Sequence, residues 1–353
     1  MTTTPQAVIV AGGYGTRLLP LTARRPKHLL EVGGVPFLEH QLARLALAGV
    51  DRVVLATSYR AELFEPLLGD GIRWGLSLAY VHEHEPLGTA GAIRNVTGAL
   101  TDDPEAAIVV LNGDVLSAHD LRRQLEDFQR PRDGARVDVS LHLVRVPDAR
   151  AYGCVPTDGE GRVTGFVEKS DHPVTDQVNA GCYVFRRRVL DRIPTGRAVS
   201  VERETFPALV ADGLLVVGYV EDAYWRDVGT PEALVAASAD LVLGRAQSPA
   251  VDSSPAGARI DPAAEVDASA VVNGGSVVLA GSRVGPRAVV SGSVLMTGSQ
   301  VDADAEVVGS VLGTGARVGA GARLDGVTVG DEVVVPDAGR PEPGSRLSRP
   351  PAR

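Results

Sequence analysis

Glycines and two cations near the start of the chain are spaced in a way that suits phosphate chemistry. A short apolar run, residues 6–10, leads into Ala11-Gly12-Gly13-Tyr14-Gly15-Thr16-Arg17, and Lys27 follows ten residues later. Glycines directly after a buried strand let backbone amides approach phosphate oxygens closely. The run lacks the Gly-Lys-Ser/Thr of a P-loop, and Leu18 stands where the dinucleotide fingerprint needs glycine. The pattern therefore predicts a nucleotide cradle of another kind.

Two aspartates, Asp114 and Asp227, lie in short motifs that could contact a ligand. Leu111-Asn112-Gly113-Asp114 ends a predicted buried strand, and Tyr224-Trp225-Arg226-Asp227-Val228-Gly229 lies far away in the sequence. Open α/β sheets bind ligands at the carboxyl ends of their strands, which is where Asp114 is expected.

The elements that must position these residues alternate between strand and helix over residues 6–240. Residues 6–10, 52–56 and 106–111 predict buried strands, Pro36 begins a helix to residue 48, and Thr230-Pro231 begin another to about residue 243. Strands separated by helices form parallel βαβ units with a sheet covered on both faces. The alternating runs 137–146, 162–167 and 182–185 predict a second lobe of antiparallel or edge strands beside that sheet.

The C-terminal part has a six-residue period. Apolar residues recur at positions 260, 266, 272, 278, 284 and 290, and after one irregular coil at 301, 307, 312, 318 and 324. This period is typical of a left-handed parallel β-helix built from hexapeptides. We expect four segments: a catalytic domain over residues 1–245, a linker over 246–258, the β-helix over 259–335 and a disordered tail over 336–353.

Composition excludes several classes of protein. The chain has 353 residues, of which 44% are hydrophobic and 22% charged, and no apolar stretch approaches the ~18 residues that a membrane helix needs. The formal charge of −9 argues against nucleic acid as a partner. Two cysteines cannot form a disulfide framework, and the first residues do not read as a signal peptide. We expect a cytoplasmic protein with reduced cysteines and no membrane association.

The run AGGYGTRLLPLTARRPKHLLEV, residues 11–32, resembles the signature of the sugar-1-phosphate nucleotidylyltransferases. The resemblance extends over about residues 6–243. It implies a Rossmann-like mixed α/β sheet flanked by helices, and a C-terminal β-helix also occurs in this family. It further implies that Ala11, Gly12, Gly13, Gly15 and Thr16 wrap the nucleotide. Two catalytic cations, Arg17 and Lys27, would then contact the triphosphate.

A second segment resembles the base-reading segment of the family members that use GTP and mannose 1-phosphate. It runs from His82 to Gly91 and contains Glu83, Pro86, Gly88 and Thr89. A carboxylate only accepts hydrogen bonds, and guanine offers adjacent N1–H and N2–H₂ donors. Either Glu83 or Glu85 could accept them, and the spacing from Gly88 favours Glu83.

The remaining site residues follow from the same resemblance. Asn112 is expected at the nucleotide, and Asp114 and Asp227 are expected to hold Mg²⁺. The expected sugar-phosphate residues are Gly153, Glu168, Lys169, Asn179 and Gly181. Lys27 and Lys169 are the only two lysines among 35 cationic residues, and both fall in these motifs.

The sequence thus predicts transfer of GMP from GTP to mannose 1-phosphate, with release of pyrophosphate. Glucose 1-phosphate or a cyclitol phosphate stays open as the acceptor, as does a catalytically silent homologue that binds a nucleotide sugar. A hexapeptide acyltransferase would need a histidine in the β-helix, yet all seven histidines lie at or before His172. The exposed end coils of a β-helix favour a homo-oligomer.

Overall fold

The computed structural model describes residues 4–349 except 168 and 255. Contacts divide the chain into two compact units. The sheet unit contains residues 4–13 and 41–225, and the β-helix unit contains residues 14–40 and 226–349. The sequence predicts a domain boundary at residue 245, whereas in the structure residues 14–40 group with the C-terminal part of the chain. One contact between these segments is the hydrogen bond that the Gly33 amide donates to Ser238 Oγ at 3.1 Å. No helix in the described ranges is long and apolar enough to span a membrane.

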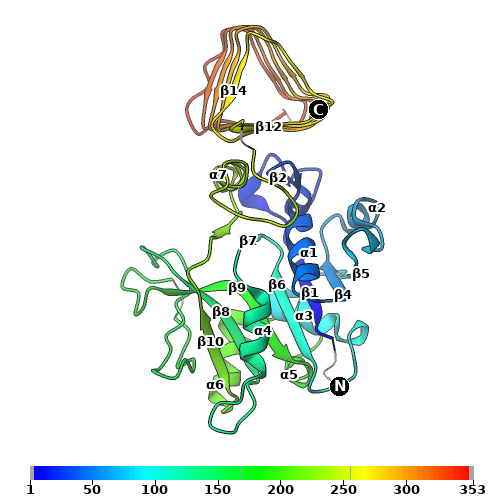
Figure 1. Cartoon of the computed structure of the whole chain (residues 1–353), viewed down its shortest axis with the longest axis vertical. Coiled ribbons are helices and arrows are strands. Elements are labelled where there is room, and N and C mark those ends of the chain that lie inside the picture. The colour runs from blue at the N-terminus through cyan, green and yellow to red at the C-terminus, as the bar shows by residue number, and fades with distance from the viewer. Residues whose placement is uncertain (1–3, 168, 255, 350–353) are drawn as a thin grey trace. The chain divides into compact units, whose positions relative to one another are not determined.

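The sheet unit is built on a seven-stranded mixed sheet, whose labelled strands lie side by side in Figure 1. Its strands, in spatial order, are β10 (Val216–Val220), β8 (Val139–Arg145), β9 (Gln177–Arg186), β6 (Ala107–Asn112), β1 (Gln6–Ala11), β4 (Arg52–Thr57) and β5 (Ser77–His82). The β6-β1-β4-β5 portion is parallel; β1, β4 and β6 match the predicted strands, whereas β5 was not predicted. Buried apolar runs at β1, β4 and β6 fit a sheet covered on both faces.

Strand β9 corrects the expected second lobe. It pairs antiparallel with β6 on one side and with β8 on the other, so residues 137–146 and 182–185 join the main sheet. Residues 162–167 form only isolated bridges, such as Thr157 with Val163 and Cys154 with Val167. The alternation of side chains located β8 and part of β9, but it wrongly predicted a strand over residues 162–167 and carries no information about strand partners.

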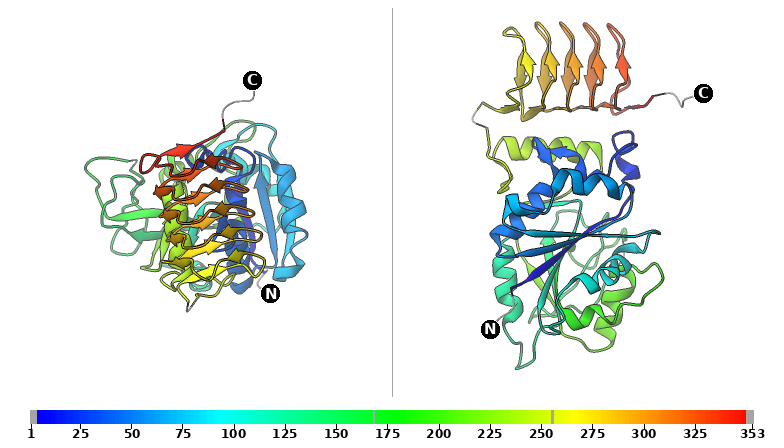
Figure 2. Two further views of the ribbon diagram at one scale, coloured as in Figure 1. Left: turned by 90° about the horizontal axis from the view of Figure 1, so that it is seen from above. Right: turned by 90° about the vertical axis from the view of Figure 1, so that its right-hand side faces the viewer.

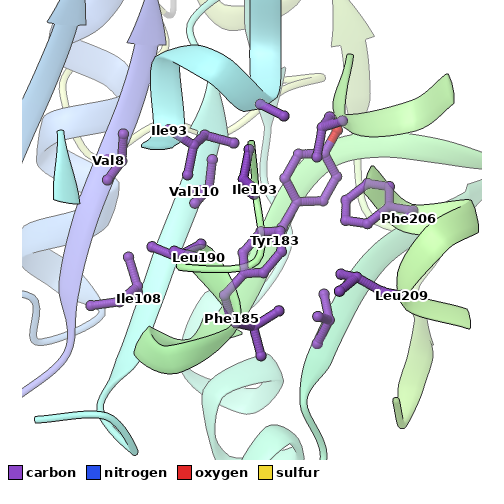
Figure 3. Close-up of a cluster of buried hydrophobic side chains, with 14 of the residues drawn as sticks. Val8, Ile93, Ile108, Val110, Tyr183, Phe185, Leu190, Ile193, Phe206 and Leu209 are labelled. Carbon is purple, nitrogen blue, oxygen red and sulfur yellow. The ribbon is translucent and has the colours of Figure 1, made fainter. Parts of the chain in front are cut away.

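Helices pack on this sheet and close its core. They are α1 (Phe37–Leu47), α2 (Phe64–Leu68), α3 (Gly88–Asn95), α4 (Leu121–Gln129), α5 (Arg187–Leu190) and α6 (Phe206–Ala211). Helix α3 contacts β1 and β4, and α4 contacts β8 and β9. In the core, Phe206 packs edge-on against Tyr183 with ring centroids 5.0 Å apart and stacks on Phe185 at 5.9 Å, as Figure 3 shows. Both cysteines are buried, and neither is in a disulfide.

The β-helix unit begins with a short hairpin and a helix. Strands β2 (Glu31–Val32) and β3 (Val35–Pro36) are joined by Gly33 and Gly34, whose φ angles of 60° and 100° suit a two-residue hairpin turn. Helix α7 (Pro231–Val242) begins as predicted, because the Thr230 side chain accepts a hydrogen bond from the Ala233 amide. A short strand, β11 (Trp225–Asp227), precedes α7 in the chain. In the sheet unit, a further short strand, β7 (Val115–Ser117), follows β6.

The predicted left-handed β-helix is confirmed as three parallel sheets that form triangular coils (Figures 1 and 2). The first sheet contains β12 (Ala258–Ile260), β15 (Ser276–Val278), β18 (Val294–Leu295), β21 (Val311–Leu312), β24 (Thr328–Val329) and β26 (Arg346–Leu347). The second contains β13 (Glu265–Val266), β16 (Arg283–Val284), β19 (Gln300–Val301), β22 (Arg317–Val318) and β25 (Val334–Val335). The third contains β14 (Val271–Asn273), β17 (Val289–Ser291), β20 (Glu306–Val308) and β23 (Arg323–Asp325).

The irregular coil has a simple cause. Val278 pairs with Leu295 and Leu295 with Leu312, so one corner of each of these coils is a residue shorter than in the first. Serine hydroxyls fix that corner: the amide of Ser293 donates to Ser276 Oγ, and the amide of Ser310 donates to Ser293 Oγ. The ladder also continues past residue 335, because β26 pairs with β24 inside the segment expected to be disordered.

Candidate active site

Glu83 is a buried carboxylate beside the glycine-rich turn of the sheet unit. It directly follows β5 and is 5% exposed, whereas Glu85 is exposed. A Cβ placed on Gly12 would lie 3.5 Å from Glu83 Oε2, so glycine lets the backbone pass close to the carboxylate. The Leu87 amide donates to Oε2 at 3.4 Å, while Oε1 has no hydrogen-bond partner among the described residues.

The surroundings of Glu83 define what it can bind. Desolvation raises the pKa of this carboxyl, and the hydrogen bond from the Leu87 amide acts in the opposite direction. A buried acceptor atom without a partner costs free energy until a donor arrives. The site therefore favours a ligand that presents N–H donors, and of the two glutamates that the sequence left open, Glu83 is the buried one.

The residues after Glu83 mainly fix the local backbone. Gly88 begins α3 with a φ of 70°, and a Cβ there would lie 2.6 Å from the carbonyl oxygen of Val199. The hydroxyl of Thr89 accepts a hydrogen bond from the Val201 amide at 2.8 Å and donates to Glu202 Oε2 at 3.4 Å. Pro86 is exposed. In the described contacts Gly88 and Thr89 hold the segment around residue 200 against the start of α3.

The loop after β6 carries Asp114. The Gly113 amide donates to the carbonyl oxygen of Val10 at 3.0 Å, which fixes the loop to the end of β1. Gln41, 3% exposed on α1, donates through Nε2 to the carbonyl oxygens of Asn112 at 2.8 Å and Val115 at 3.2 Å. Asp114 is half-buried and lies between Asn112 and Val115 in the sequence. Sequence reasoning missed Gln41, although a polar residue among the apolar positions of α1 is a signal.

Two of the expected sugar residues, Asn179 and Gly181, lie on β9. Asn179 Oδ1 accepts a hydrogen bond from the Gly181 amide at 3.0 Å, and its Nδ2 donates to the Tyr183 hydroxyl at 2.8 Å. The Gly153 carbonyl oxygen accepts from the Asn179 amide at 3.3 Å. Gly181 has a φ of 72°, and a Cβ there would lie 3.0 Å from Asn112 Nδ2. The structure thus brings Asn112, Asn179, Gly153 and Gly181 together.

Two further residues connect these groups. The Tyr183 hydroxyl donates to Glu202 Oε1 at 3.4 Å, and Glu202 also accepts the hydrogen bond from Thr89. Burial raises the pKa of Tyr183 well above its usual value, so the hydroxyl keeps its proton. Lys169 is exposed in the loop before β9, and Glu168 lies outside the described residues.

The β-helix unit carries the two expected catalytic cations. The Thr22 hydroxyl donates to the carbonyl oxygen of Gly15 at 2.8 Å, and a Cβ on Gly15 would lie 3.0 Å from Lys27 Cβ. Glycine with a φ of 65° at that position therefore lets the stem of Lys27 lie against the turn. Arg17 Nη2 lies 3.8 Å from Asp227 Oδ1, and the Arg17 side chain is 63% exposed.

No group of three or more His, Cys, Asp and Glu side chains that could hold a metal ion occurs within residues 4–349, leaving aside 168 and 255. Asp114 and Asp227 belong to different units. Carboxylate oxygens fit Mg²⁺ chemically, but the further ligands of such an ion would have to be water or substrate oxygens.

Family profiles account for almost the whole chain. One described as "Nucleotidyl transferase" matches residues 6–242, and one described as "GMPPB C-terminal domain" matches residues 256–339. The chain belongs to the nucleotidyl transferase family. The resemblance and the fold class predicted from the sequence are confirmed.

Individual relatives show which proteins this chain is similar to in sequence. A mannose-1-phosphate guanylyltransferase of Mycobacterium tuberculosis is 57% identical over 246 residues, which cover 69% of this chain and 67% of that protein. The catalytic subunit beta of a mannose-1-phosphate guanylyltransferase from Danio rerio is 39% identical over 64% of this chain and 62% of its own length. The chain thus spans about three fifths to two thirds of these relatives.

Among solved structures, HddC from Yersinia pseudotuberculosis is similar with a TM-score of 0.56 and 29% identity, covering 66% of this chain and 97% of that one. A second structure of HddC, complexed with GMP-PN, has a TM-score of 0.55 and 28% identity over the same shares. HddC thus has a fold similar to about two thirds of this chain, and one of its two structures is a complex with GMP-PN.

Proposed function

We propose that this protein transfers GMP from GTP to mannose 1-phosphate, forming GDP-mannose and pyrophosphate. A phosphate oxygen of the sugar phosphate attacks the α-phosphorus of GTP in line. A new P–O bond forms there, and the bond from the α-phosphorus to the bridging oxygen of pyrophosphate breaks. The acceptor is already anionic, so the reaction needs no side-chain nucleophile.

The buried carboxylate of Glu83 is the observation that carries this proposal. Its Oε1 atom has no hydrogen-bond partner among the described residues. The neighbouring residue Gly12 has no side chain, so its backbone lies close to the Glu83 carboxylate. Guanine presents the N1–H and N2–H₂ donor pair that such a carboxylate accepts, and adenine does not. The names of the similar mannose-1-phosphate guanylyltransferases support the same base and the same sugar.

The remaining roles are assigned on the family resemblance. Arg17 and Lys27 neutralise the triphosphate, and Lys169 neutralises the sugar phosphate, so catalysis is mainly positioning and charge stabilisation. Asp114 and Asp227 are each proposed as ligands of Mg²⁺, which when bound lowers the charge on phosphate oxygens. The resemblance assigns the nucleotide to the backbone at Ala11, Gly12, Gly13, Gly15 and Thr16 and to Pro86, Gly88, Thr89 and Asn112. It assigns the sugar to Gly153, Glu168, Asn179 and Gly181.

The test is pyrophosphate release with Mg²⁺ over a grid of the common NTPs against mannose 1-phosphate, glucose 1-phosphate and a cyclitol phosphate. Release only from GTP with mannose 1-phosphate supports the proposal in full. Release from GTP with another acceptor keeps the base and the mechanism but replaces the sugar. No release from any pair, in folded protein that binds nucleotide, favours the silent regulatory homologue instead.

Self-association is part of the proposal. Ile260 in the first coil is 44% exposed, whereas the equivalent Val278 in the next coil is 1% exposed. The first coil thus leaves apolar interior surface uncovered, which a second copy would bury. Sedimentation velocity measures the oligomeric state directly. A cytoplasmic location stays a prediction from the sequence.

A further inference from the structure

The loop that carries both catalytic cations, residues 14–27, contacts the last coils of the β-helix within the same unit. The first contact is at Arg17 itself. Arg346 in β26 donates through Nη1 to the carbonyl oxygen of Arg17 at 2.6 Å and lies 3.5 Å from that of Leu19. Its own side chain is 39% exposed, so Arg346 is not part of the β-helix interior.

The second contact is a close packing of backbone against proline. A Cβ placed on Gly330 would lie 3.0 Å from Pro20 Cγ and 3.0 Å from the carbonyl oxygen of Leu347. The Gly330 amide donates to that same carbonyl at 2.8 Å, which fixes Gly330 in the β24–β26 ladder. Pro20 therefore packs closely against the coil at a position where any side chain would be crowded.

The third contact is a partly buried ion pair. Arg25 Nη2 donates to Asp331 Oδ2 at 2.7 Å and to Thr314 Oγ1 at 2.9 Å. The two charged side chains are 21% and 12% exposed, so water screens them less than it screens the other ion pairs of the coil surface. Asp331 is itself held, because its Oδ1 accepts a hydrogen bond from the Thr314 amide.

From these contacts we infer that the C-terminal coils, residues 311–347, position the loop for catalysis, with Arg346 as the positioning residue for Arg17. The inference rests on the proposed function for its kinetic part. The contacts at residues 17, 20 and 25 restrain the loop, and none of these three contacts uses the side chain of Arg17 or Lys27. A loop held in place before substrate binds loses less freedom when it binds, and a small displacement of a catalytic cation is costly in rate.

The experiment compares Arg346→Ala with Arg317→Ala in the full chain. Arg317 is a matched control: it is also the first residue of a β-helix strand, its side chain is 54% exposed, and it pairs with Asp302 away from the loop. We expect amide hydrogen exchange in residues 14–27 to become about tenfold faster in Arg346→Ala, because a hydrogen bond from a charged group is lost. Exchange in β15 to β18 should not change in either variant.

Kinetics test the link to Arg17. In Arg346→Ala, kcat should fall about tenfold or more while the KM of mannose 1-phosphate stays unchanged. Arg346→Lys keeps a donor and should restore part of kcat. In the Arg17→Ala background, Arg346→Ala should cause little further loss of kcat, because it acts through Arg17. A merely structural residue would instead give additive losses.

The outcomes separate this inference from the proposed function. Unchanged exchange in residues 14–27 overturns the inference whatever the substrate is. Faster exchange with unchanged kcat in an active enzyme overturns the positioning role. The variant could also show faster exchange in a chain that releases no pyrophosphate from any NTP. This result would support the contacts of the C-terminal coils with residues 14–27 and would overturn only the proposed function.

Discussion

Replacing Glu83 by glutamine isolates the proposed base-reading contact. The variant keeps the shape of the side chain but exchanges one carboxylate oxygen for an NH₂ group, which would face the N–H donors of guanine. Loss of one hydrogen bond to a charged group costs about 1.5–3 kcal/mol. That loss corresponds to a decrease in kcat/KM for GTP of roughly 10- to 100-fold.

The assay is pyrophosphate release with GTP and with ATP at saturating mannose 1-phosphate. The decrease should be confined to GTP, so the preference for GTP over ATP should shrink by the same factor. Glu85→Gln is the matched control, because Glu85 is exposed two residues away and should leave both nucleotides unaffected. An unchanged preference in Glu83→Gln would refute the assignment of Glu83.

The raised pKa of Glu83 adds two directional expectations. Guanine needs the carboxylate, so kcat/KM for GTP should fall as the pH drops through this raised pKa, and Glu83→Gln should lack that limb. A carboxyl whose pKa is raised in the folded state lowers stability as the pH rises above the unfolded value. Glu83→Gln should therefore raise the Tm of the ligand-free protein at pH 7 and leave it unchanged near pH 4.

Further substitutions test the other assignments. Asp227→Ala should abolish pyrophosphate release at saturating Mg²⁺ with little change in Tm; near-normal turnover would remove Asp227 from the metal site. Lys169→Ala should raise the KM of the sugar phosphate about tenfold, or ~1.4 kcal/mol, while leaving the KM of GTP unchanged. Gly181→Ala should lower the free energy of unfolding in urea by about 1–3 kcal/mol, because it combines a φ of 72° with the close approach of Asn112. Gly49→Ala, with a φ of 84° and nothing within 4 Å, should cost less; equal losses would show that backbone strain alone accounts for both.

Local patterns were sufficient for the elements that recur along the chain. Buried apolar runs located β1, β4 and β6, and the Thr-Pro pair located the start of α7. The hexapeptide period gave the interior residues of the β-helix, because each coil repeats the same geometry. It also held a signal that was overlooked: Leu347 lies three hexapeptides after Val329, to which it pairs. Residues 336–353 are rich in proline and arginine, and this composition led to the prediction of a disordered tail instead of a last coil.

Contacts between distant segments could not be predicted in this way. Gln41 bonds to backbone carbonyls some seventy residues later, and Arg346 to a carbonyl more than three hundred residues earlier. Such bonds depend on the fold and leave no period in the sequence. The spacing from Gly88 favoured Glu83 over Glu85, but the burial of Glu83 could not be predicted from the sequence.

The register of one ladder explains how the predicted nucleotide and sugar residues come together. Strands β6 and β9 run antiparallel with Leu111 opposite Cys182, so the next residue of β6, Asn112, comes to lie beside Gly181. The left-handed conformation of Gly181 leaves room for the Asn112 side chain there. A shift by one residue would turn the side chains of β9 to the opposite face of the sheet and break this juxtaposition. Because β8 also pairs with β9 on its other side, the sheet itself holds Asn112 and Asn179 in a fixed relation before any substrate binds.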